Sequence, residues 1–513
     1  MKKPAYKWIA LSVTTIGSLM VAIDSTIVIL ALPNMLQDLH SNLVTMTWVI
    51  IGYLLVNTVL QLTFGRMADM FGRVKMYNLG FIVFTAGSVL CGFSSSDTML
   101  IVSRLIQGVG GAMLSANAMA IITEVFPSNQ RGQAMGINTI TWGAGSVLGP
   151  VLGGLILAVT GWRWIFLVNL PIGIVGTLAA YILLHDIAPN PRGERFDIIG
   201  AVIFTVGLVL LLIGLTGGIG SGWLSPSILA MLIAGIIAFI VFVIYERRVS
   251  HPMLDLHLFD DRVYGFSVAA ALLQSLSIFA VNFLIVFYLQ GVRGYSPLTA
   301  ALLILPLPIL TSIFGPIGGR MADRLGGTLP STIGLALQAL ALVALIFLSP
   351  TSPYVILALA LTLMGIGGGL FWSPNTSTAM GAAPRNRLGV ASATLNTLRN
   401  VGMVFSFAVA LAVAAASMPP ALVNEVFLGT VSHIAPSIAS AFTGAMSHAF
   451  IASIVICLIA LGFSAVRGEK AATASASQEQ YDKTKATGSE IPVGTAPTKS
   501  GDGAAGESHM LLP

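Results

Sequence analysis

Long apolar runs alternate with short polar segments along the chain as far as residue 466. The runs contain roughly 18 to 28 residues, and about 20 helical residues cross a hydrocarbon core of about 30 Å. The pattern therefore predicts an all-α integral membrane protein with fourteen spanning helices. The expected spans cover residues 8–31, 48–64, 76–93, 99–122, 132–159, 164–184, 198–215, 228–245, 264–289, 298–317, 329–348, 354–372, 388–415 and 445–466.

The composition excludes a soluble protein. Hydrophobic residues make up 56% of the chain and charged residues 9%, with a mean hydropathy of +0.90. A soluble chain of this composition would expose large apolar patches to water. The basic residues of the loops fall on the side of the N-terminus, except Arg163 and Arg293, so the positive-inside rule places both termini in the cytoplasm. These loops account for the net charge of +5, which therefore indicates no nucleic-acid partner.

One five-residue stretch occurs twice, at 65–69 and at 319–323, and each copy closes a long apolar run. Internal duplication is common in membrane transporters. The copies close the second and tenth expected spans, so equal halves of six helices require an inserted pair. The predicted domains are an N-terminal six-helix bundle (1–190), an inserted two-helix hairpin with linkers (191–262), a C-terminal six-helix bundle (263–470) and a disordered cytoplasmic tail (471–513), whose Ala, Gly, Ser, Thr and Lys residues provide little apolar surface.

Four local patterns carry a resemblance to a known family. They lie at 23–33, at 65–75, at 104–108 and at 145–154. In this order and on these helices, they resemble the fourteen-helix drug:proton antiporter branch of the major facilitator superfamily. The resemblance covers essentially all of the chain before the tail. It implies the major facilitator fold in a 6+2+6 arrangement and proton-coupled export of lipophilic, cationic drugs or toxic compounds across the cytoplasmic membrane.

The resemblance also implies which partners to expect. These are small lipophilic or cationic substrates, protons and the bilayer, with no cofactor and a monomeric protein. The alternative is a transporter of an endogenous metabolite, lipid or sugar. An enzyme is not expected, because the chain has no His-Glu-x-x-His pattern and no nucleophile elbow. A metal site is not expected either, because His251, Asp255 and His257 lie in a short loop that a solvated face explains better.

Ionisable residues inside spans are costly and are seldom retained without a use. Asp24, Arg104 and Arg399 are the clear cases. Asp24 and Arg104 are expected at a similar depth in the outer half of the membrane, where a carboxylate beside a cation can take up and release a proton. Structural roles remain open: a hydrogen bond to Ser or Thr for Asp24, and contact with the outer headgroups for Arg104. For Arg399, structural pairing is the expected role.

The 65–75 loop resembles the conformational latch of the family. Its carboxylate is expected to cap a facing helix or to pair with a cation across the two halves. Its glycines are expected to form a tight turn. The alternative is that its basic residues only fix the topology. The expected latch residues are Gly65, Arg66, Asp69, Gly72 and Arg73, with Glu124, Arg131 and, in the second copy, Asp323.

Two further sets of residues complete the predicted sites. The glycine-rich fifth span predicts a kinked helix that packs closely between the halves, although ordinary glycine packing is an equal alternative. A substrate cavity needs apolar walls and a few polar groups, although aromatic stripes are more often packing surfaces. The predicted hinge and packing residues are Gly145, Gly149, Pro150, Gly153 and Gly154. The predicted cavity residues are Asn57, Gln61, Asn117, Phe279, Asn282, Phe283, Trp372 and Asn375.

Overall fold

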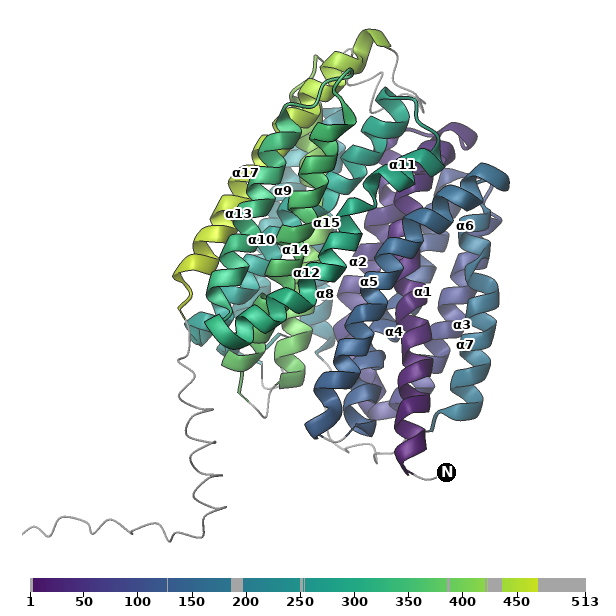
Figure 1. Ribbon diagram of the computed structural model, residues 1–513, viewed down its shortest axis with the longest axis vertical. Helices are drawn as coiled ribbons and strands as arrows, with labels where there is room; N and C mark the ends of the chain where they lie inside the picture. The colour runs from purple at the N-terminus through teal and green to yellow at the C-terminus, as the bar shows by residue number, and fades with distance from the viewer. Residues whose placement is uncertain are drawn as a thin grey trace, which may run out of the picture. The chain divides into compact units, whose positions relative to one another are not determined.

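The computed structural model describes residues 3–126, 128–185, 197–249, 252, 254–384, 388–419, 422 and 436–468. Helices are the only regular structure in these ranges (Figure 1). Fourteen of the described helices or helix pairs are long and apolar enough to cross a membrane, which confirms the predicted number of spans. The predicted tail at 471–513 lies outside the described residues.

The first seven helices pack mainly against one another and are called the N-terminal group. They are α1 (Lys3–Asp38), α2 (Leu43–Phe71), α3 (Arg73–Gly92), α4 (Asp97–Val125), α5 (Ser128–Val159), the short α6 (Trp164–Leu167) and α7 (Asn169–Leu183). Helix α4 contacts α1, α2 and α3, and α5 packs along α1. The face at which α1 begins is called the lower face, and the face at which it ends the upper face (Figure 1).

A hairpin follows, formed by α8 (Ile198–Ser221) and α9 (Pro226–Glu246). Its helices pack against each other, and α8 also contacts α2. Most of α9 faces outward with bare aliphatic side chains, such as Ile236 and Ile237, which are more than half exposed. Lipid is the solvent that such a surface requires.

The remaining helices form the C-terminal group. They are the 3-10 turn η1 (Leu256–Asp260), α10 (Arg262–Phe287), the π-helical turn η2 (Tyr288–Val292), α11 (Pro297–Ile304), α12 (Pro306–Leu325), α13 (Thr328–Ile346), α14 (Tyr354–Ala382), α15 (Leu388–Ala416) and α17 (Pro436–Val466). Helix α14 packs on α12 and α13, and α10 packs on α15 and α17. The two groups meet where α5 contacts α11 and α12 and where α2 contacts α15, and α8 also reaches α15.

The helices up to residue 468 belong to one compact unit. The contacts do not separate this unit at residues 190 and 262. The 6+2+6 division, its domain boundaries and the cytoplasmic placement of the termini therefore stay predictions.

Prolines explain where the helices differ from the predicted spans. The sixth span is divided at Val168, because Pro171 has no N–H to donate to the carbonyl of residue 167. The tenth is divided at Leu305, just before Pro306. The last helix begins at Pro436 rather than at residue 445. Proline is favoured in the first turn because N–H groups there have no acceptor within the helix, so its lack of an N–H costs no hydrogen bond.

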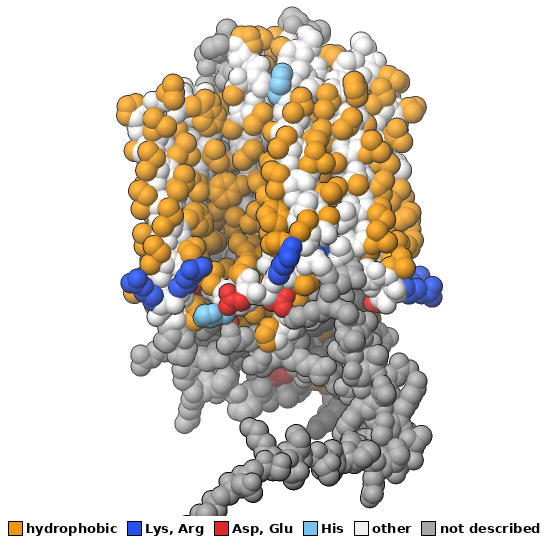
Figure 2. Space-filling model, turned by 90° about the vertical axis from the view of Figure 1, so that its left-hand side faces the viewer, with side chains coloured by type: hydrophobic (Ala, Val, Ile, Leu, Met, Phe, Trp, Pro, Cys, Tyr) orange, Lys and Arg blue, Asp and Glu red, His pale blue; other side chains and the backbone are white. Residues whose placement is uncertain are grey.

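The surface separates into bands. On the side shown in Figure 2, a wide belt of hydrophobic side chains covers the helices, and the visible Lys and Arg side chains lie below it, at the lower face. At the upper face, Asn42 and Ser96 accept hydrogen bonds from the backbone N–H groups of Thr45 and Met99 and so begin α2 and α4. An apolar belt with polar ends is the pattern of a membrane-spanning protein.

Candidate functional site

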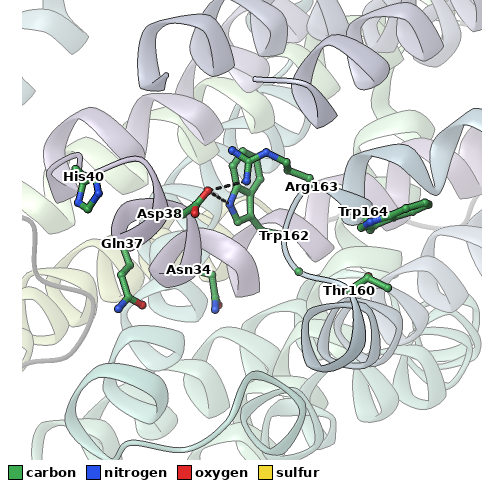
Figure 3. Close-up of a pocket in the computed structure, with 9 residues that line it drawn as sticks. Asn34, Gln37, Asp38, His40, Thr160, Trp162, Arg163 and Trp164 are labelled. Atoms are coloured by element: carbon green, nitrogen blue, oxygen red, sulfur yellow. Dashed lines mark hydrogen bonds and ion pairs between the residues drawn. The ribbon is translucent and has the colours of Figure 1, made fainter. Parts of the chain in front are cut away.

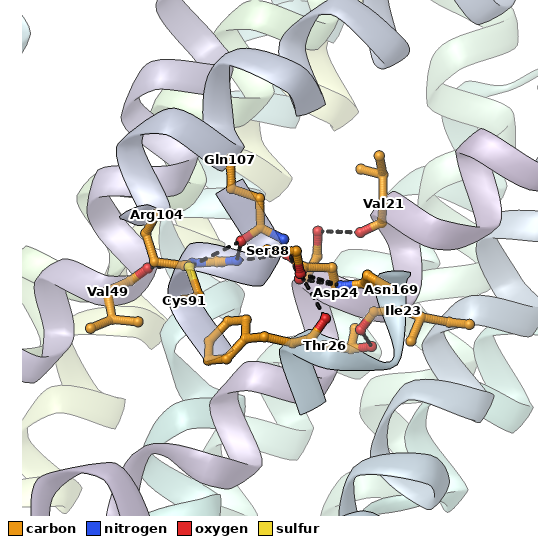
Figure 4. Close-up of polar contacts among 12 residues, drawn as sticks. Val21, Ile23, Asp24, Thr26, Val49, Ser88, Cys91, Arg104, Gln107 and Asn169 are labelled. Carbon is orange, nitrogen blue, oxygen red and sulfur yellow. Dashed lines mark hydrogen bonds and ion pairs between the residues drawn. The ribbon is translucent and has the colours of Figure 1, made fainter. Parts of the chain in front are cut away.

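The carboxylate of Asp24 lies inside the N-terminal group. Helix α1 carries it, and the side chain is fully enclosed by other residues. Arg104 of α4, also buried, donates from Nη1 to Asp24 Oδ2 at 2.7 Å. The structure thus brings together the two residues that the sequence predicted to share one depth, and it joins them directly (Figure 4).

Two amides complete the hydrogen bonds of this carboxylate. Gln107 Nε2 and Asn169 Nδ2 donate to Asp24 Oδ1 at 2.8 and 3.1 Å. Arg104 Nη1 also donates to Gln107 Oε1 at 2.6 Å, and its Nε donates to the carbonyl of Val49 at 3.0 Å. Both carboxylate oxygens therefore have partners, as a buried ion pair requires.

A second set of contacts holds these partners in place. The guanidinium of Arg104 lies over the ring of Tyr53, with 4.2 Å between Cζ and the ring centroid. Asn169 Nδ2 also donates to Ser88 Oγ at 3.0 Å, and Ser88 in turn donates to the carbonyl of Phe166 at 2.8 Å. The network thus connects α1, α2, α3, α4 and α7 with α6.

Helix geometry explains why these groups converge. Arg104 and Gln107 are three residues apart and therefore share one face of α4. Gly87 lets α3 come close to that face, since a Cβ at this position would lie 2.6 Å from Gln107 Cα. Close approach at small residues is the usual way in which membrane helices pack.

The pair has two chemically distinct states. When Asp24 is ionised, it accepts from three donors and balances the charge of Arg104. A proton on either oxygen removes that balance and replaces an acceptor with a donor, so the hydrogen bonds must rearrange. A change in the protonation of Asp24 therefore changes the contacts that join α1 to α4 and α7.

The predicted latch residues are only partly described. The side chains of Arg66, Asp69 and Arg131 lie outside the described part. Gly72 ends α2 with a φ of 105°, which confirms a tight turn there, but Gly65 lies within α2, so the interpretation of Gly65 as a turn residue was wrong. Helix α2 continues to Phe71 because residues 65–71 include good helix formers such as Met67 and Ala68.

The turn brings one predicted ion pair together. Arg73 Nη1 lies 3.3 Å from Glu124 Oε2, which links the start of α3 to the end of α4. Both helices belong to the N-terminal group, so this contact does not cross to the other group. Asp323 is exposed at the lower end of α12.

The glycine-rich stretch packs α5 against α1. A Cβ at Gly145 would meet Ala22, one at Gly149 would meet Thr26, and one at Gly153 would lie 2.7 Å from Ile27 Cγ1. Gly154 points the other way, and its Cβ would lie 2.8 Å from Leu298 Cα in α11. Pro150 lies within α5. One face of the stretch thus packs within the N-terminal group, and Gly154 packs against the C-terminal group.

The predicted cavity residues do not converge on one place. Phe279 and Phe283 pack on Phe407 within the C-terminal group, each at 5.6 Å between ring centroids. Asn117 donates to the Met113 carbonyl of its own helix, and Asn57 faces Gly111 of α4. The Oδ1 atoms of Asn117 and Asn282 are buried without a hydrogen-bond partner. Most of this set is thus internal to one group or the other.

Asn375 belongs to a separate cluster near the lower face. Its Oδ1 accepts from Arg467 Nη1 at 2.6 Å, and its Nδ2 donates to the Ser267 carbonyl at 3.0 Å. Arg467, almost fully buried, also donates to the Gly327 carbonyl at 2.6 Å. This cluster fastens the end of α17 to the turn between α12 and α13, so Asn375 has a structural use.

Gln61 and Trp372 lie where the two groups meet. Asn400 Nδ2 of α15 donates to Gln61 Oε1 of α2 at 3.2 Å. The neighbouring Arg399 lies over the ring of Trp372 at 5.4 Å. The place where these residues of α2, α14 and α15 meet is called the seam.

A hollow is present at the upper face, away from all of these residues. It has a volume of about 560 Å³ and lies between the end of α1 and the turn after α5 (Figure 3). Asp38 accepts there from Trp162 Nε1 at 3.0 Å and from Arg163 Nη1 at 2.6 Å. The hollow is open to the surroundings and contains none of the predicted site residues.

Comparison with known proteins decides the family. The family model described as Major Facilitator Superfamily matches residues 14–407. The chain belongs to the major facilitator superfamily. It is 34% identical to the multidrug resistance protein Stp of Mycobacterium tuberculosis (strain ATCC 25618 / H37Rv), over 80% of this chain and 76% of that one. It is 31% identical to the tetracenomycin C resistance and export protein of Streptomyces glaucescens, over 77% and 73%.

Another similar protein carries a different name. The riboflavin transporter RibZ of Clostridioides difficile (strain 630) is 32% identical over 78% of this chain and 87% of that one. Among solved structures, the peptide transporter POT in complex with sulfate aligns with a TM-score of 0.64 at 16% identity, over 91% and 99% of the chains. The relatives confirm the resemblance to the fourteen-helix drug antiporter branch. This superfamily member is thus a multi-pass membrane transporter and not an enzyme.

The sequence did not identify every residue around Asp24. Gln107 lies within the 104–108 pattern, and its spacing of three from Arg104 was an available signal. Asn169 is a polar residue inside a span, and such residues are uncommon in the bilayer core. Ser88 and Tyr53 gave no signal, because their types occur in any helix.

Proposed function

We propose that this transporter exports lipophilic drugs or other toxic compounds in exchange for protons, by alternating access of the cargo to the two faces. The observation that supports the proposal most is the enclosed ion pair between Asp24 and Arg104. Among the described residues, Asp24 is the only carboxylate far from both ends of a span. Names of similar proteins that refer to drug resistance and export support the cargo class.

In the proposed cycle, Asp24 carries the proton. Protonation removes the charge that balances Arg104, and the guanidinium keeps the Val49 carbonyl and Gln107 Oε1 as partners. The helices that carry the network then shift, and this shift favours the opposite-facing conformation. Release of the proton restores the pair. The proton gradient drives this cycle without a cofactor.

The proposed orientation places the lower face in the cytoplasm. Most described Lys and Arg residues near span ends lie at that face, for example Lys75 and Arg248, whereas Arg163 and Arg293 lie at the upper face. Near the upper face the two groups are in contact, because Gln290 Nε2 of η2 donates to the Leu30 carbonyl of α1 at 3.0 Å. In this orientation, the described conformation joins the groups on the outer side.

The expected preference for cations depended on Asp24 meeting the cargo. In the described conformation its carboxylate is enclosed and has three donors, so a cargo molecule has no access to it. Asp24 can therefore couple protons without selecting the charge of the cargo.

The test uses proteoliposomes with an imposed pH gradient and the dye ethidium as cargo. One pH unit supplies about 1.4 kcal/mol per proton, so exchange of one proton per cargo supports about tenfold accumulation if no other charge moves. Asp24→Asn keeps the size of the side chain but cannot cycle a proton, and we expect it to abolish accumulation. Asp38 also lies on α1 and pairs with an arginine, Arg163, so Asp38→Asn is the control, and we expect it to accumulate dye as the wild type does. Undiminished accumulation by Asp24→Asn would remove this residue from the mechanism.

A second candidate function has its own support in the riboflavin transporter that resembles this chain. We propose a flat heteroaromatic metabolite as the alternative cargo. Uptake of radiolabelled riboflavin into the same proteoliposomes distinguishes the two, since a drug exporter is expected to show none above protein-free vesicles.

A further inference from the structure

Arg399 is a cation at membrane depth that has no charged partner in the described part of the chain. At a rise of about 1.5 Å per residue, Arg399 lies about 14 Å along α15 from Val390, the residue at which the span begins. Its Nε atom is buried without a hydrogen-bond partner, and no described carboxylate is within ion-pair distance. The ring of Trp372, 5.4 Å from Cζ, is the contact that it makes with the described residues. The expectation that Arg399 has a structural partner therefore fails within the described residues.

Comparison with Arg104 shows what is missing. Arg104 has the Asp24 carboxylate, the Val49 carbonyl and Gln107 Oε1, besides the Tyr53 ring. Among the described residues, Arg399 has only the equivalent of the Tyr53 contact. Contact with an aromatic ring offsets only a small part of the free energy that it costs to place a guanidinium in the bilayer. A charge at membrane depth with this deficit indicates a ligand that supplies the missing acceptor.

The position of Arg399 indicates a ligand that is transported. It lies at the seam, beside the hydrogen bond from Asn400 to Gln61 that connects the two groups. Substrate sites of duplicated transporters lie between the repeats near the middle of the membrane. A side chain at the seam can contact the cargo when the transport cycle separates the two helix groups.

We propose that Arg399 and Trp372 bind the anionic group of a planar organic anion. The guanidinium presents a fork that matches a carboxylate in a bidentate arrangement. A flat ring attached to the carboxylate then lies along the indole of Trp372, which provides apolar contact area. The inference rests on the proposed transport function and adds planar aromatic acids to its cargo classes.

Three probes with the same ring isolate the role of charge. They are 1-pyrenecarboxylate, the neutral 1-pyrenecarboxamide and the cation 1-pyrenemethylammonium. Binding is measured by equilibrium dialysis on the purified full-length protein in phosphatidylcholine nanodiscs, with protein-free nanodiscs as blanks. We expect the carboxylate to bind about tenfold or more tightly than the other two, the ratio that one charge-assisted hydrogen bond provides. No pH gradient is present, so the result is independent of whether Asp24 couples protons.

Variants assign the effect to the two residues. Arg399→Gln is expected to lower carboxylate affinity about tenfold and leave the amide unchanged, and Arg399→Lys to retain part of the preference. Trp372→Leu is expected to weaken all three probes alike. Arg262→Gln serves as the matched control, since Arg262 also lies over an aromatic ring, that of Phe266, but at the lower face. We expect it to bind as the wild type does.

Three results would overturn the proposal. One is equal affinity of the three probes for the wild-type protein, and another is tightest binding of the cation. The third is an Arg399→Gln variant that loses the amide and the carboxylate in equal proportion, since this would show a role in folding rather than in charge recognition. If the anion binds as expected but is not accumulated under a pH gradient, proton coupling fails and the binding site stands.

Discussion

Two arginines at membrane depth show how different the surroundings of one residue type are in this transporter. Arg104 is held by a carboxylate, a carbonyl, an amide and a ring, and each contact fixes the guanidinium in one orientation. Among the described residues, Arg399 is held by one ring. The first arrangement gives the carboxylate and the guanidinium hydrogen-bond partners, whereas the second leaves Arg399 Nε without one among the described residues. The two residues therefore have different proposed roles.

At this scale, the fork of Arg104 can be tested by Arg104→Lys. Lysine keeps the positive charge, but its single ammonium nitrogen cannot reach Asp24, Gln107 and the Val49 carbonyl together. We expect proton-driven accumulation of ethidium to fall about tenfold or more, because at least one charge-assisted hydrogen bond is lost.

The matched control for this variant is Arg163→Lys. Arg163 also pairs with an aspartate of α1, Asp38, but both side chains are more than a third exposed at the upper face. Exposed pairs contribute little, so we expect nearly unchanged accumulation. Equal losses in the two variants would contradict a special role for the Arg104 geometry.

At the scale of elements, close approach of α5 to α1 depends on glycines. The positions 145, 149 and 153 recur every four residues and so lie on one face of α5, and each added Cβ would meet a residue of α1. The sequence contains a similar Gly-Pro pair in α12, but no described atom beyond the chain neighbours and backbone of its own helix lies within 4 Å of the Cβ position of Gly315. Identical dipeptides thus have different packing.

This difference predicts different effects of one substitution. Gly149→Ala forces α5 away from Thr26, and we expect it to cost about 1–3 kcal/mol of stability, the usual cost of overpacking. Gly315→Ala places the same methyl group in open space, and we expect no loss. Thermal unfolding of the two purified variants in detergent measures the difference. If Gly315→Ala were as unstable as Gly149→Ala, the loss of stability would come from the position directly before a proline and not from contact with α1.

At the scale of the whole molecule, the helix count and the two faces define a topology. In the described chain, Ser95 and Ser227 lie exposed at the upper face, and Lys75 and Arg248 lie exposed at the lower face. Ser227 and Arg248 are at opposite ends of α9 and so report on the hairpin.

We expect cysteines at Ser95 and Ser227 to react with an impermeant thiol reagent in intact cells, and cysteines at Lys75 and Arg248 to react only after the cells are opened. The native Cys91 and Cys457 are buried and give a low background. Labelling of the Arg248→Cys variant in intact cells would contradict the inserted hairpin, and labelling of Lys75→Cys would contradict the orientation.

The sequence by itself determined the membrane setting, the number of spans and the family. These depend on local quantities, because a run of about 20 apolar residues spans a bilayer whatever its neighbours are. It also identified Asp24 and Arg104, since charge inside a span stands out without any structure. The helix ends were less accurate, because Gly65 and the start of α17 depend on helix propensity in amphipathic sequence, where the hydropathy signal is weak.

Only the tertiary structure decided which polar residues meet. Asn375 looked like a cavity residue but bonds to Arg467, and Phe279 and Phe283 pack on Phe407, since neighbours across helices depend on rotation and crossing that no local pattern encodes. For the same reason the amides of Gln107 and Asn169 were not seen to complete the Asp24 network. Arg399 was conspicuous in the sequence, but its lack of a charged partner among the described residues depends on the position of every helix around it.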